Sequence, residues 1–426
     1  MDKKQRLVIV GAGFGGLTLA KRIDRRKYDV VIVDRRNYHS FPPLFYQVAS
    51  SGLEPANIAF PIRRELRRRS MRGTSYHYGK VTEIDMADRV VVTQYERISF
   101  DKLVIAAGTT NNFFGIQGLD EHVYTMKTVP EAIRARNAVL GHLERGCIEK
   151  DARKRRELLT FVVIGGGPAG VEVAGALGEM KRYIVPREYP GIDGDEVRVI
   201  LIEGTDRLLG TMSEASSHDA AKALSELLVD VRLGARVKSV ADGRVLFADG
   251  SVLDADTVLW TAGVTGVPFK LSGTDVTAGR GGRFAVDEYN RVEGLDGVYA
   301  IGDIAAHTDA RFPGGCPQVA QPAIQQARTL ARNLNAPGFF VPFRYRDKGS
   351  MATIGRNRAV VDMGRMHVSR LPAWLLWMAV HLMSLMGMRN RLMVFINWCV
   401  NYFNFGSPLR VLMRPSRLPL PSFRDE

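Results

Sequence analysis

The stretch LVIVGAGFGGLTLAKRIDRRKYDVVIVD, residues 7–34, decides the fold. Its apolar, β-branched opening at 7–10 predicts a buried parallel strand, and the glycines that follow predict a tight turn into a helix over 17–23. A second apolar run at 30–33 predicts the next parallel strand and ends in an acid, Asp34. This order of strand, glycine turn, helix and acid-ended strand is typical of a dinucleotide-binding βαβ unit.

Each glycine of the turn has a mechanical role. Gly11 permits the tight bend, Gly13 lets the backbone approach a pyrophosphate, and Gly16 lets the helix pack closely on the strand. Unpaired N–H groups at the helix start favour the negative phosphates. Asp34 is placed to accept hydrogen bonds from a ribose diol, so we expect this unit to bind a dinucleotide.

The unit occurs a second time. FVVIGGGPAGVEVA at 161–174 again predicts a strand, a glycine turn and a helix, with Gly165, Gly167 and Gly170 in the corresponding places. The strand predicted next ends in another acid, Glu203. A recurring unit of this kind indicates two homologous modules rather than two unrelated loops.

A second pair of motifs supports the repeat. LVIAAGTT at 103–110 contains Ala107 and Gly108, and VLWTAGVT at 258–265 contains Gly263 in the matching place. The offset between the copies is nearly the same as for the glycine turns, as expected for a duplicated module. Two modules imply two nucleotides that face each other.

Glu203 bears on the choice between NADH and NADPH. An acid at that strand end accepts from the adenosine 2′-hydroxyl of NADH, whereas the 2′-phosphate of NADPH meets like charge and normally needs an arginine. Arg207, four residues further on, compensates this repulsion in part. The sequence therefore favours NADH over NADPH.

Composition narrows the classes of partner. A chain of 426 residues with net charge +14 can bind nucleic acid, but we find no nucleic-acid-binding motif and no zinc-ligand or other metal spacing. An anionic membrane surface suits the charge better. Cys147, Cys316 and Cys399 are scattered, as in a reducing cytosol, and glycines interrupt the apolar N-terminus, which argues against export.

The C-terminal residues 371–405 change in character. They include Trp374, Trp377 and Trp398 among many other apolar residues. The cleanest apolar run, 371–388, contains a proline, a histidine and a serine, so it is marginal for crossing a bilayer, which takes about 20 apolar residues.

The polar residues of this tail favour helices that lie in the membrane interface. Asn397, Asn401 and Asn404 form one polar stripe on a helix, and aromatic residues beside basic ones are typical of interfacial helices. The basic residues are Arg389, Arg391, Arg410, Arg414 and Arg417. A buried helical hairpin, a dimer interface and a true span are the alternatives.

Nearly the whole chain resembles the type II NADH dehydrogenases, the single-subunit, non-proton-pumping NADH:quinone oxidoreductases. The stretches that carry this resemblance are GAGFGG, FPPLFYQVA, DKLVIAAGTTNNFFG, VVIGGGPAGVEVAGALGE, VLWTAGV, VYAIGD, CPQVAQPAIQQA, DKGSMATIGRNRAV and AWLLWMAVHL. The resemblance implies FAD in the first module, NADH in the second, and ubiquinone or menaquinone as the electron acceptor. It also implies peripheral attachment to the cytoplasmic face of the cell membrane, with a homodimer as one arrangement.

Four residues gain a catalytic role from the resemblance. Gln321 and Gln325, one helical turn apart, match an element placed at the quinone head group, and Pro322 predicts that their helix begins near 318–321. Glu172 matches an acid near the flavin, and Lys348 matches a lysine near the isoalloxazine and is its expected partner. Burial would raise the pKa of Glu172 whereas a helix N-terminus and a lysine would lower it. A structural cap or salt bridge is the alternative for both.

The expected fold is α/β, with two Rossmann-like modules and a C-terminal amphipathic helical membrane-docking region. Its expected parts are residues 1–117 and 271–340 for FAD, 118–270 for NADH, and 341–426 for membrane docking. The residues expected to hold the cofactors are Gly11, Gly13, Phe14, Gly15, Gly16, Asp34, Ala107, Gly108, Gly302, Asp303 and Ala320, and Gly165, Gly167, Gly170, Glu203 and Gly263.

Two other classes of protein stay open at this stage. A sulfide:quinone oxidoreductase has this architecture but needs cysteines at the flavin, and here only Cys316 is a candidate for that place. A non-catalytic, membrane-attached protein that binds flavin and NAD is the other alternative. The presence of Glu172, Glu203 and Gln321 favours the enzyme.

Overall fold

The computed structural model describes residues 4–404 and 409–412. Its residues pack into two compact units. Of the described residues, the first unit takes 4–40, 59–112 and 263–349, and the second takes 41–58, 113–262, 350–404 and 409–412. By packing, the segment from residue 350 onward belongs with the second unit, whereas the sequence suggested a separate region from residue 341. The assignment of cofactors to these parts stays a prediction.

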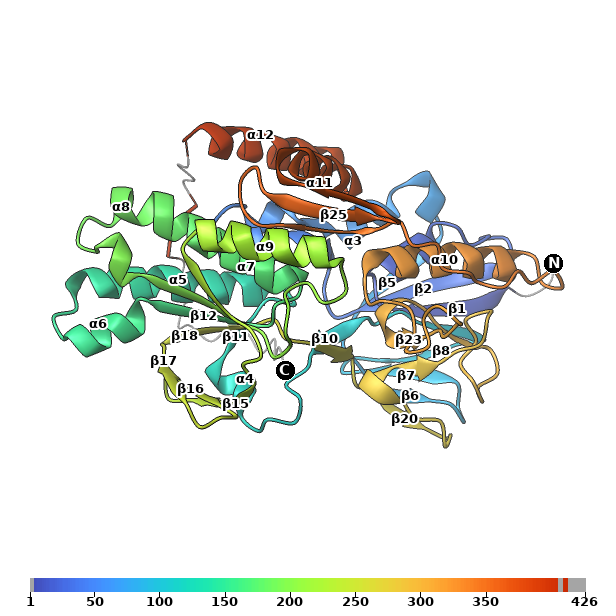
Figure 1. The fold of residues 1–426 in the computed structure, drawn as a ribbon. Helices are drawn as coiled ribbons and strands as arrows, with labels where there is room; N and C mark the ends of the chain where they lie inside the picture. Colours follow the sequence, from blue (N-terminus) through green and yellow to red (C-terminus); the bar gives the residue numbers. More distant parts are fainter. Residues whose placement is uncertain (1–3, 405–408, 413–426) are drawn as a thin grey trace. The chain divides into compact units, whose positions relative to one another are not determined.

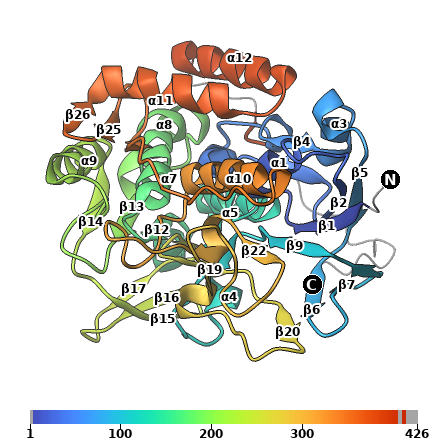
Figure 2. The same ribbon diagram turned by 90° about the vertical axis from the view of Figure 1, so that its right-hand side faces the viewer.

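The first unit is built on a parallel five-stranded sheet in the order β22-β9-β1-β2-β5. Its strands are β1 (Gln5–Val10), β2 (Tyr28–Asp34), β5 (Thr74–Tyr78), β9 (Lys102–Ile105) and β22 (Val298–Ala300). The strands predicted at 7–10 and 30–33 are therefore confirmed. Helices α1 (Phe14–Ala20) and α10 (Ala320–Asn335) lie side by side (Figure 2), and α10 begins within the predicted range.

Smaller elements complete the first unit. An antiparallel meander runs through β6 (Val81–Asp85), β7 (Val90–Thr93) and β8 (Arg97–Ser99), with β20 (Lys270–Ser272) beside β6. The others are β3 (Tyr38–Ser40), β4 (Ala59–Pro61), α3 (Ile62–Leu66), β10 (Thr109–Asn111), β19 (Val264–Gly266), β21 (Phe284–Ala285) and β23 (Ala305–Ala306).

The second unit repeats the same sheet plan. Its parallel sheet has the order β11-β18-β12-β13-β14, so β18, β12 and β13 stand where β9, β1 and β2 stand in the first. The repeat expected from the motifs is therefore present. The elements are β11 (Tyr124–Thr125), β12 (Thr160–Ile164), β13 (Arg198–Ile202), β14 (Val229–Arg232), β18 (Thr257–Trp260), α2 (Phe45–Ala49), α4 (Leu119–His122), α5 (Val129–Ile148), α6 (Ala152–Leu158), α7 (Pro168–Glu179), α8 (Val185–Glu188), α9 (Glu214–Glu226), β15 (Val237–Ala241), β16 (Arg244–Phe247) and β17 (Val252–Asp254).

The chain after residue 349 packs on the helices of this second unit. Strands β24 (Ser350–Thr353), β25 (Ala359–Met363) and β26 (Met366–Ser369) form an antiparallel sheet that contacts α7 and α9. Helices α11 (Arg370–Ser384) and α12 (Met388–Asn404) lie next to each other, and α11 packs on β25 (Figure 1). Among the described residues, no helix is both long and apolar enough to cross a membrane.

Candidate active site

The first glycine turn has the geometry that the sequence predicts. Gly11 has φ +105°, and a Cβ there would lie 2.3 Å from the carbonyl oxygen of Ala106. A Cβ on Gly16 would lie 1.9 Å from the carbonyl oxygen of Gly11, so helix and strand are in close contact. Gly13 faces open space, since a Cβ there meets no atom within 4 Å. The turn is therefore closely packed at Gly11 and Gly16 and open at Gly13, which leaves room for a pyrophosphate.

The strand-end acid Asp34 is tied to this turn. Its carboxylate accepts hydrogen bonds from the peptide N–H of Ala12 at 2.7 Å and of Arg36 at 2.8 Å. Burial raises the pKa of Asp34, while these N–H groups and the nearby arginines act against that increase. The acid therefore both shapes the loop and keeps acceptor capacity for a ribose hydroxyl.

The second turn repeats these features. Gly165 has φ +112°, a Cβ on Gly170 would lie 1.8 Å from the Gly165 oxygen, and Gly167 faces open space. The Glu203 carboxylate accepts from the N–H of Gly166 at 2.6 Å and from Thr205. Each unit thus ties a strand-end acid to its glycine loop.

The side chain of Arg207 already makes a hydrogen bond to the backbone. Its guanidinium donates to the carbonyl oxygen of Gly210 at 2.7 Å. This bond engages one of the five guanidinium donors, and the contact of Arg207 with a 2′-phosphate stays a prediction.

The Gly302-Asp303 turn is held by a residue that sequence reasoning missed. Gln326, buried on α10, accepts from the N–H of Gly302 at 2.7 Å, and Gly302 has φ +76°. The Asp303 carboxylate accepts from the hydroxyl of Thr109 at 3.2 Å. Gln326 is the residue after Gln325 in the quoted CPQVAQPAIQQA stretch, but nothing in the sequence showed which glutamine turns inward.

The second pair of repeated motifs meets in a short antiparallel ladder within the first unit. The N–H of Asn112 donates to the Gly263 oxygen at 3.0 Å, and that of Val267 donates to the Gly108 oxygen at 3.2 Å. Gly108 has φ +69°, a conformation that favours glycine. The structure brings these two glycine segments together in one unit, which the sequence did not predict.

Gln321 and Gln325 project to one face of α10, as predicted, but both amides bind backbone. Gln321 donates to the Gly349 oxygen at 2.9 Å and accepts from the N–H of Lys348 at 3.1 Å. Gln325 donates to the Arg346 oxygen and accepts from its N–H, at 2.9 and 3.0 Å. The two glutamines therefore clamp the segment that carries Lys348.

Glu172 is a buried carboxyl in the second unit. It is the fifth residue of α7, which begins at Pro168, so it lies just beyond the first turn where the sequence placed it. Burial raises the pKa of Glu172 to about 8, because the backbone of Thr353 and the indole N–H of Trp377 oppose the rise only in part. The question that the sequence left open is decided in favour of burial. Lys348 belongs to the other unit, and its pairing with Glu172 stays a prediction.

Aromatic residues to which the sequence analysis assigned no catalytic role lie near this carboxyl. Trp377, which is 1 % exposed, contacts Tyr46 edge-on with 6.3 Å between the ring centres. Burial and the charge of Glu172 raise the pKa of Tyr46. Both aromatic residues line a cavity of about 150 Å³ with Thr353 and Trp398. Tyr46 lies in the quoted FPPLFYQVA stretch, which was the only available signal.

The described thiols do not resemble a sulfur-handling site. Cys147, Cys316 and Cys399 are free, and Cys316 lies buried in the first unit. Burial raises the pKa of its thiol to about 11, so it stays protonated at neutral pH and is a poor nucleophile.

Known families match almost the whole chain. Residues 5–327 match the pyridine nucleotide-disulphide oxidoreductase family, and 348–406 match the NDH2 C-terminal domain. The type II NADH:quinone oxidoreductase Ndh of Mycobacterium tuberculosis is 33% identical over 419 residues, which cover 94% of this chain and 89% of that protein. The chain belongs to the type II NADH:quinone oxidoreductases.

Other relatives of these oxidoreductases agree with the assignment. The mitochondrial internal alternative NAD(P)H-ubiquinone oxidoreductase A1 of Arabidopsis thaliana is 32% identical, over 95% of this chain and 85% of that protein. The expected family, fold class and enzyme class are confirmed, and so are FAD and NADH as the cofactors of a type II NADH:quinone oxidoreductase.

Solved structures show the same fold. NDH2 from Plasmodium falciparum in complex with NADH has a TM-score of 0.87 at 22% identity, covering 97% of this chain and 100% of that one. The sulfide:quinone oxidoreductase of Aquifex aeolicus has a TM-score of 0.70 at 19% identity, covering 96% of each chain. The rival class thus has the fold in common, whereas the match to the NDH2 C-terminal domain identifies the type II NADH:quinone oxidoreductases.

Proposed function

We propose that this chain oxidises NADH and passes the electrons to a membrane quinone, with FAD held by the first unit and NADH by the second. The observation that carries the proposal is the duplicated loop. The N–H of Ala12 donates to Asp34 at 2.7 Å, and that of Gly166 donates to Glu203 at 2.6 Å. Two such loops in one chain supply one site for each dinucleotide.

The residues of the first unit fit FAD. The open space before Gly13 accommodates a pyrophosphate, and the acceptor oxygens of Asp34 and Asp303 suit the hydroxyls of a ribose and of the ribityl chain. When bound, FAD supplies the redox chemistry, taking a hydride from NADH and giving two electrons to a quinone. The protein's own residues bind, orient and control protons.

Glu172 holds a proton at neutral pH. With a pKa of about 8, its carboxyl carries a hydrogen that it can donate to a quinone oxygen as negative charge develops there. The buried indole of Trp377 keeps bulk water away and so maintains the raised pKa. We assign Glu172 as the proton donor to the quinone.

Gln321 and Gln325 position the segment that carries Lys348. Four hydrogen bonds join the two amides to the backbone of residues 346–349. These bonds engage both the nitrogen and the oxygen of each amide and so fix its orientation on the segment. We therefore assign both glutamines to positioning Lys348, whose ammonium would favour negative charge on bound FAD.

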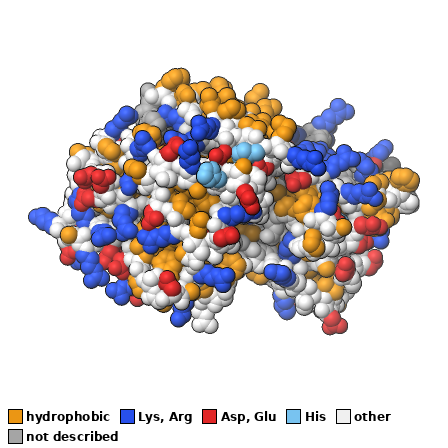
Figure 3. Space-filling model, viewed as in Figure 1, with side chains coloured by type: hydrophobic (Ala, Val, Ile, Leu, Met, Phe, Trp, Pro, Cys, Tyr) orange, Lys and Arg blue, Asp and Glu red, His pale blue; other side chains and the backbone are white. Residues whose placement is uncertain are grey.

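The helices α11 and α12 form the membrane-docking face. Figure 3 shows hydrophobic side chains gathered over these two helices. The exposed ones are Leu371, Leu375, Val380, Met383, Met388, Leu392, Phe395, Ile396, Val400, Tyr402 and Phe403. Docking on the cytoplasmic face of the cell membrane fits this surface and the three free cysteines.

The composition of this face differs from the expectation. Trp377 was expected on it but is buried, because it packs against Tyr46. Arg391 donates to two backbone oxygens of its own hairpin, and Arg410 pairs with Glu188. Arg414 and Arg417 lie outside the described residues. Within the described part of the chain, Arg389 is the expected fringe residue whose side chain makes neither a hydrogen bond nor an ion pair.

The first test is turnover of the purified, FAD-loaded protein. NADH should be oxidised by a soluble quinone, and NADPH much more slowly. Failure to oxidise NADH with any quinone contradicts the proposed reaction.

The second test addresses the docking face. The double variant Leu375→Glu, Leu392→Glu should no longer bind vesicles. It should lose turnover with long-chain quinones but keep turnover with soluble analogues. Val252→Glu, at an equally exposed position on β17, is the matched control. If the wild-type protein ignores vesicles of every composition, the face instead pairs two copies of the chain, which sedimentation measures.

A further inference from the structure

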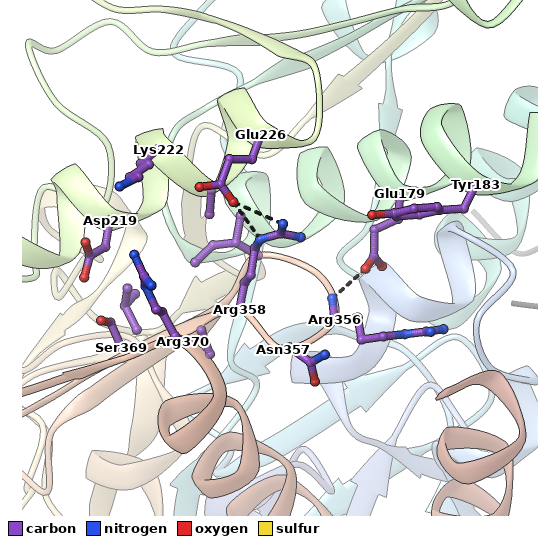
Figure 4. A pocket seen from close by; sticks show the side chains of 14 residues that line it. Glu179, Tyr183, Asp219, Lys222, Glu226, Arg356, Asn357, Arg358, Ser369 and Arg370 are labelled. Atoms are coloured by element: carbon purple, nitrogen blue, oxygen red, sulfur yellow. Dashed lines mark hydrogen bonds and ion pairs between the residues drawn. The ribbon is translucent and has the colours of Figure 1, made fainter. Parts of the chain in front are cut away.

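A second cavity opens in the same second unit, and it shares Glu179 and Arg356 with the cavity that Tyr46 and Trp377 line. It has a volume of about 400 Å³ and is lined by residues of α7, α9, the β24–β25 turn and the start of α11 (Figure 4). Its polar lining side chains are Glu179, Tyr183, Asp219, Lys222, Glu226, Arg356, Asn357, Arg358, Ser369 and Arg370. None of these residues has a place in the reaction described above.

The acids of this cavity already have partners. Glu226 pairs with Arg358 at 3.1 Å, and Glu179 accepts from the N–H of Arg356 at 2.5 Å. Asp219 contacts the imidazole of His367 at 3.0 Å. The negative charge of Glu226 and Asp219 is therefore offset in part by Arg358 and His367.

Two cationic side chains of the cavity have no acidic partner in the described structure. Lys222 and Arg370 line it, and neither makes a hydrogen bond or ion pair within residues 4–404 and 409–412. Arg370 is also the first residue of α11, where the positive end of the helix dipole adds to its charge. The cavity therefore attracts an anion.

The side chain of Asn357 contributes a hydrogen-bond acceptor that lacks a donor. Its side-chain oxygen is buried without a partner in the described structure, and the residue lines the same cavity. A buried acceptor of this kind destabilises the fold unless a donor reaches it. A ligand that carries both an anionic group and a hydroxyl satisfies the two cations and this oxygen together.

We propose that this cavity binds the phosphodiester headgroup of an anionic, glycerol-bearing lipid, with Lys222 and Arg370 on the phosphate. The inference rests on the proposed docking face, because α11 carries the exposed Leu371 and Leu375 directly after Arg370. A headgroup in the cavity leaves its acyl chains beside these two leucines. A free phosphate gains nothing from them, so the lipid is the better ligand.

The test is calorimetric and uses the full-length, FAD-loaded protein with dihexanoyl phosphatidylglycerol below its micelle concentration. Wild-type protein should bind this lipid at least tenfold more tightly than inorganic phosphate or glycerophosphocholine. The double variant Lys222→Gln, Arg370→Gln should weaken binding at least tenfold. Lys222→Arg, Arg370→Lys should restore it, because the charges are kept.

Arg365→Gln is the matched control. Arg365 is exposed on the β25–β26 turn, does not line the cavity, and has no ion pair in the described structure. It should change lipid affinity by less than twofold. Equal weakening by this control, unchanged binding in the double variant, or phosphate binding as tight as lipid each overturns the proposal.

The outcome is separable from that of the docking proposal. If full-length protein binds the short-chain lipid but ignores vesicles, the headgroup site stands and the docking face fails. Thermal unfolding of each variant establishes that it is folded. Should the double variant not fold, the single variant Lys222→Gln, at an exposed position on α9, should still weaken binding at least threefold, and unchanged affinity would overturn the site.

Discussion

The indole N–H of Trp398 donates a hydrogen bond to the side-chain oxygen of Gln47, with 2.8 Å between nitrogen and oxygen. The amide of Gln47 in turn donates to the hydroxyl of Tyr46 at 2.7 Å, and Asn401 donates to the Gly52 oxygen at 3.1 Å. These contacts fasten α12 to the segment around α2, although about 350 residues separate them in the sequence. The C-terminal helices are therefore part of the second unit's packing.

Truncation inside α11 should destabilise the second unit. Because Trp377 is buried against Tyr46, Trp377→Ala should lower the free energy of unfolding by about 3–5 kcal/mol. Leu375→Ala, at an exposed position of the same helix, should change it by less than about 0.5 kcal/mol. Urea unfolding measures both, and similar values for the two variants would contradict the packing role of Trp377.

Glu172 should make stability depend on pH. Its pKa is raised from 4.5 to about 8 in the folded protein, so its contribution is complete below about pH 4.5 and is lost as pH rises towards 8. Glu172→Gln should remove this loss, so the stability of the variant relative to wild type should increase between pH 5 and pH 8. A difference that stays constant with pH would mean that the carboxyl is not buried as a neutral acid.

The same residue should shape the pH profile of turnover. Wild-type quinone reduction should fall as pH rises above about 8, because the carboxyl loses its proton. Glu172→Gln should slow quinone reduction about 100-fold and abolish that decline. Flavin reduction by NADH, followed in stopped flow, should change far less.

His367 should make the protein less stable as pH rises, whereas a carboxylate with a lowered pKa makes a protein less stable as pH falls. Burial lowers the pKa of His367, but hydrogen bonds to Asp219 and Asp362, both at 3.0 Å, outweigh burial and raise it. The stabilisation is fully present below the ordinary histidine pKa of about 6.5 and is lost as pH rises through the raised value. His367→Gln should flatten this part of the stability profile, which thermal unfolding measures. A wild-type profile that rises above pH 7 would contradict the arrangement.

Glu203 should set the choice of nicotinamide cofactor. Glu203→Gln removes the charge that repels a 2′-phosphate, so the ratio of kcat/KM for NADH over NADPH should fall about tenfold. Glu188→Gln removes one acid from a distant helix of the same unit and is the control. Wild-type protein that uses NADPH as well as NADH would show that Glu203 does not read the 2′ position.

Gln321 should act on one half-reaction. Gln321→Ala removes two hydrogen bonds to residues 348 and 349 and so releases Lys348, whose charge favours the reduced state. Reduction of the enzyme by NADH should therefore slow about tenfold, while its reoxidation by quinone stays nearly unchanged. Arg328→Ala, exposed on the same helix, should leave both unchanged. Equal slowing of both half-reactions would make Gln321 a residue that only supports the fold.

The two nucleotide-binding units could be predicted because their signals are local. The run from Leu7 to Val10, the glycines at 11 and 16, and Asp34 fix a strand, a turn and the next strand through neighbours in the sequence. A Cβ at Gly11 or Gly16 would collide with backbone in any fold of this type, so the residue alone carries the information. In the second unit, Gly165 and the strand-end acid Glu203 carry the same kind of local information.

What only the tertiary structure decided depends on residues far apart in the chain. The pKa of Glu172 follows from burial under Trp377, and the orientation of Trp377 follows from its contact with Tyr46. The partners of Gln321 lie in a later segment, so helical spacing could predict its face but not its bonds. Helical periodicity marks a side chain as apolar without saying whether protein or lipid covers it. That choice is made by the surfaces that meet when the chain folds, which is why Trp377 is buried.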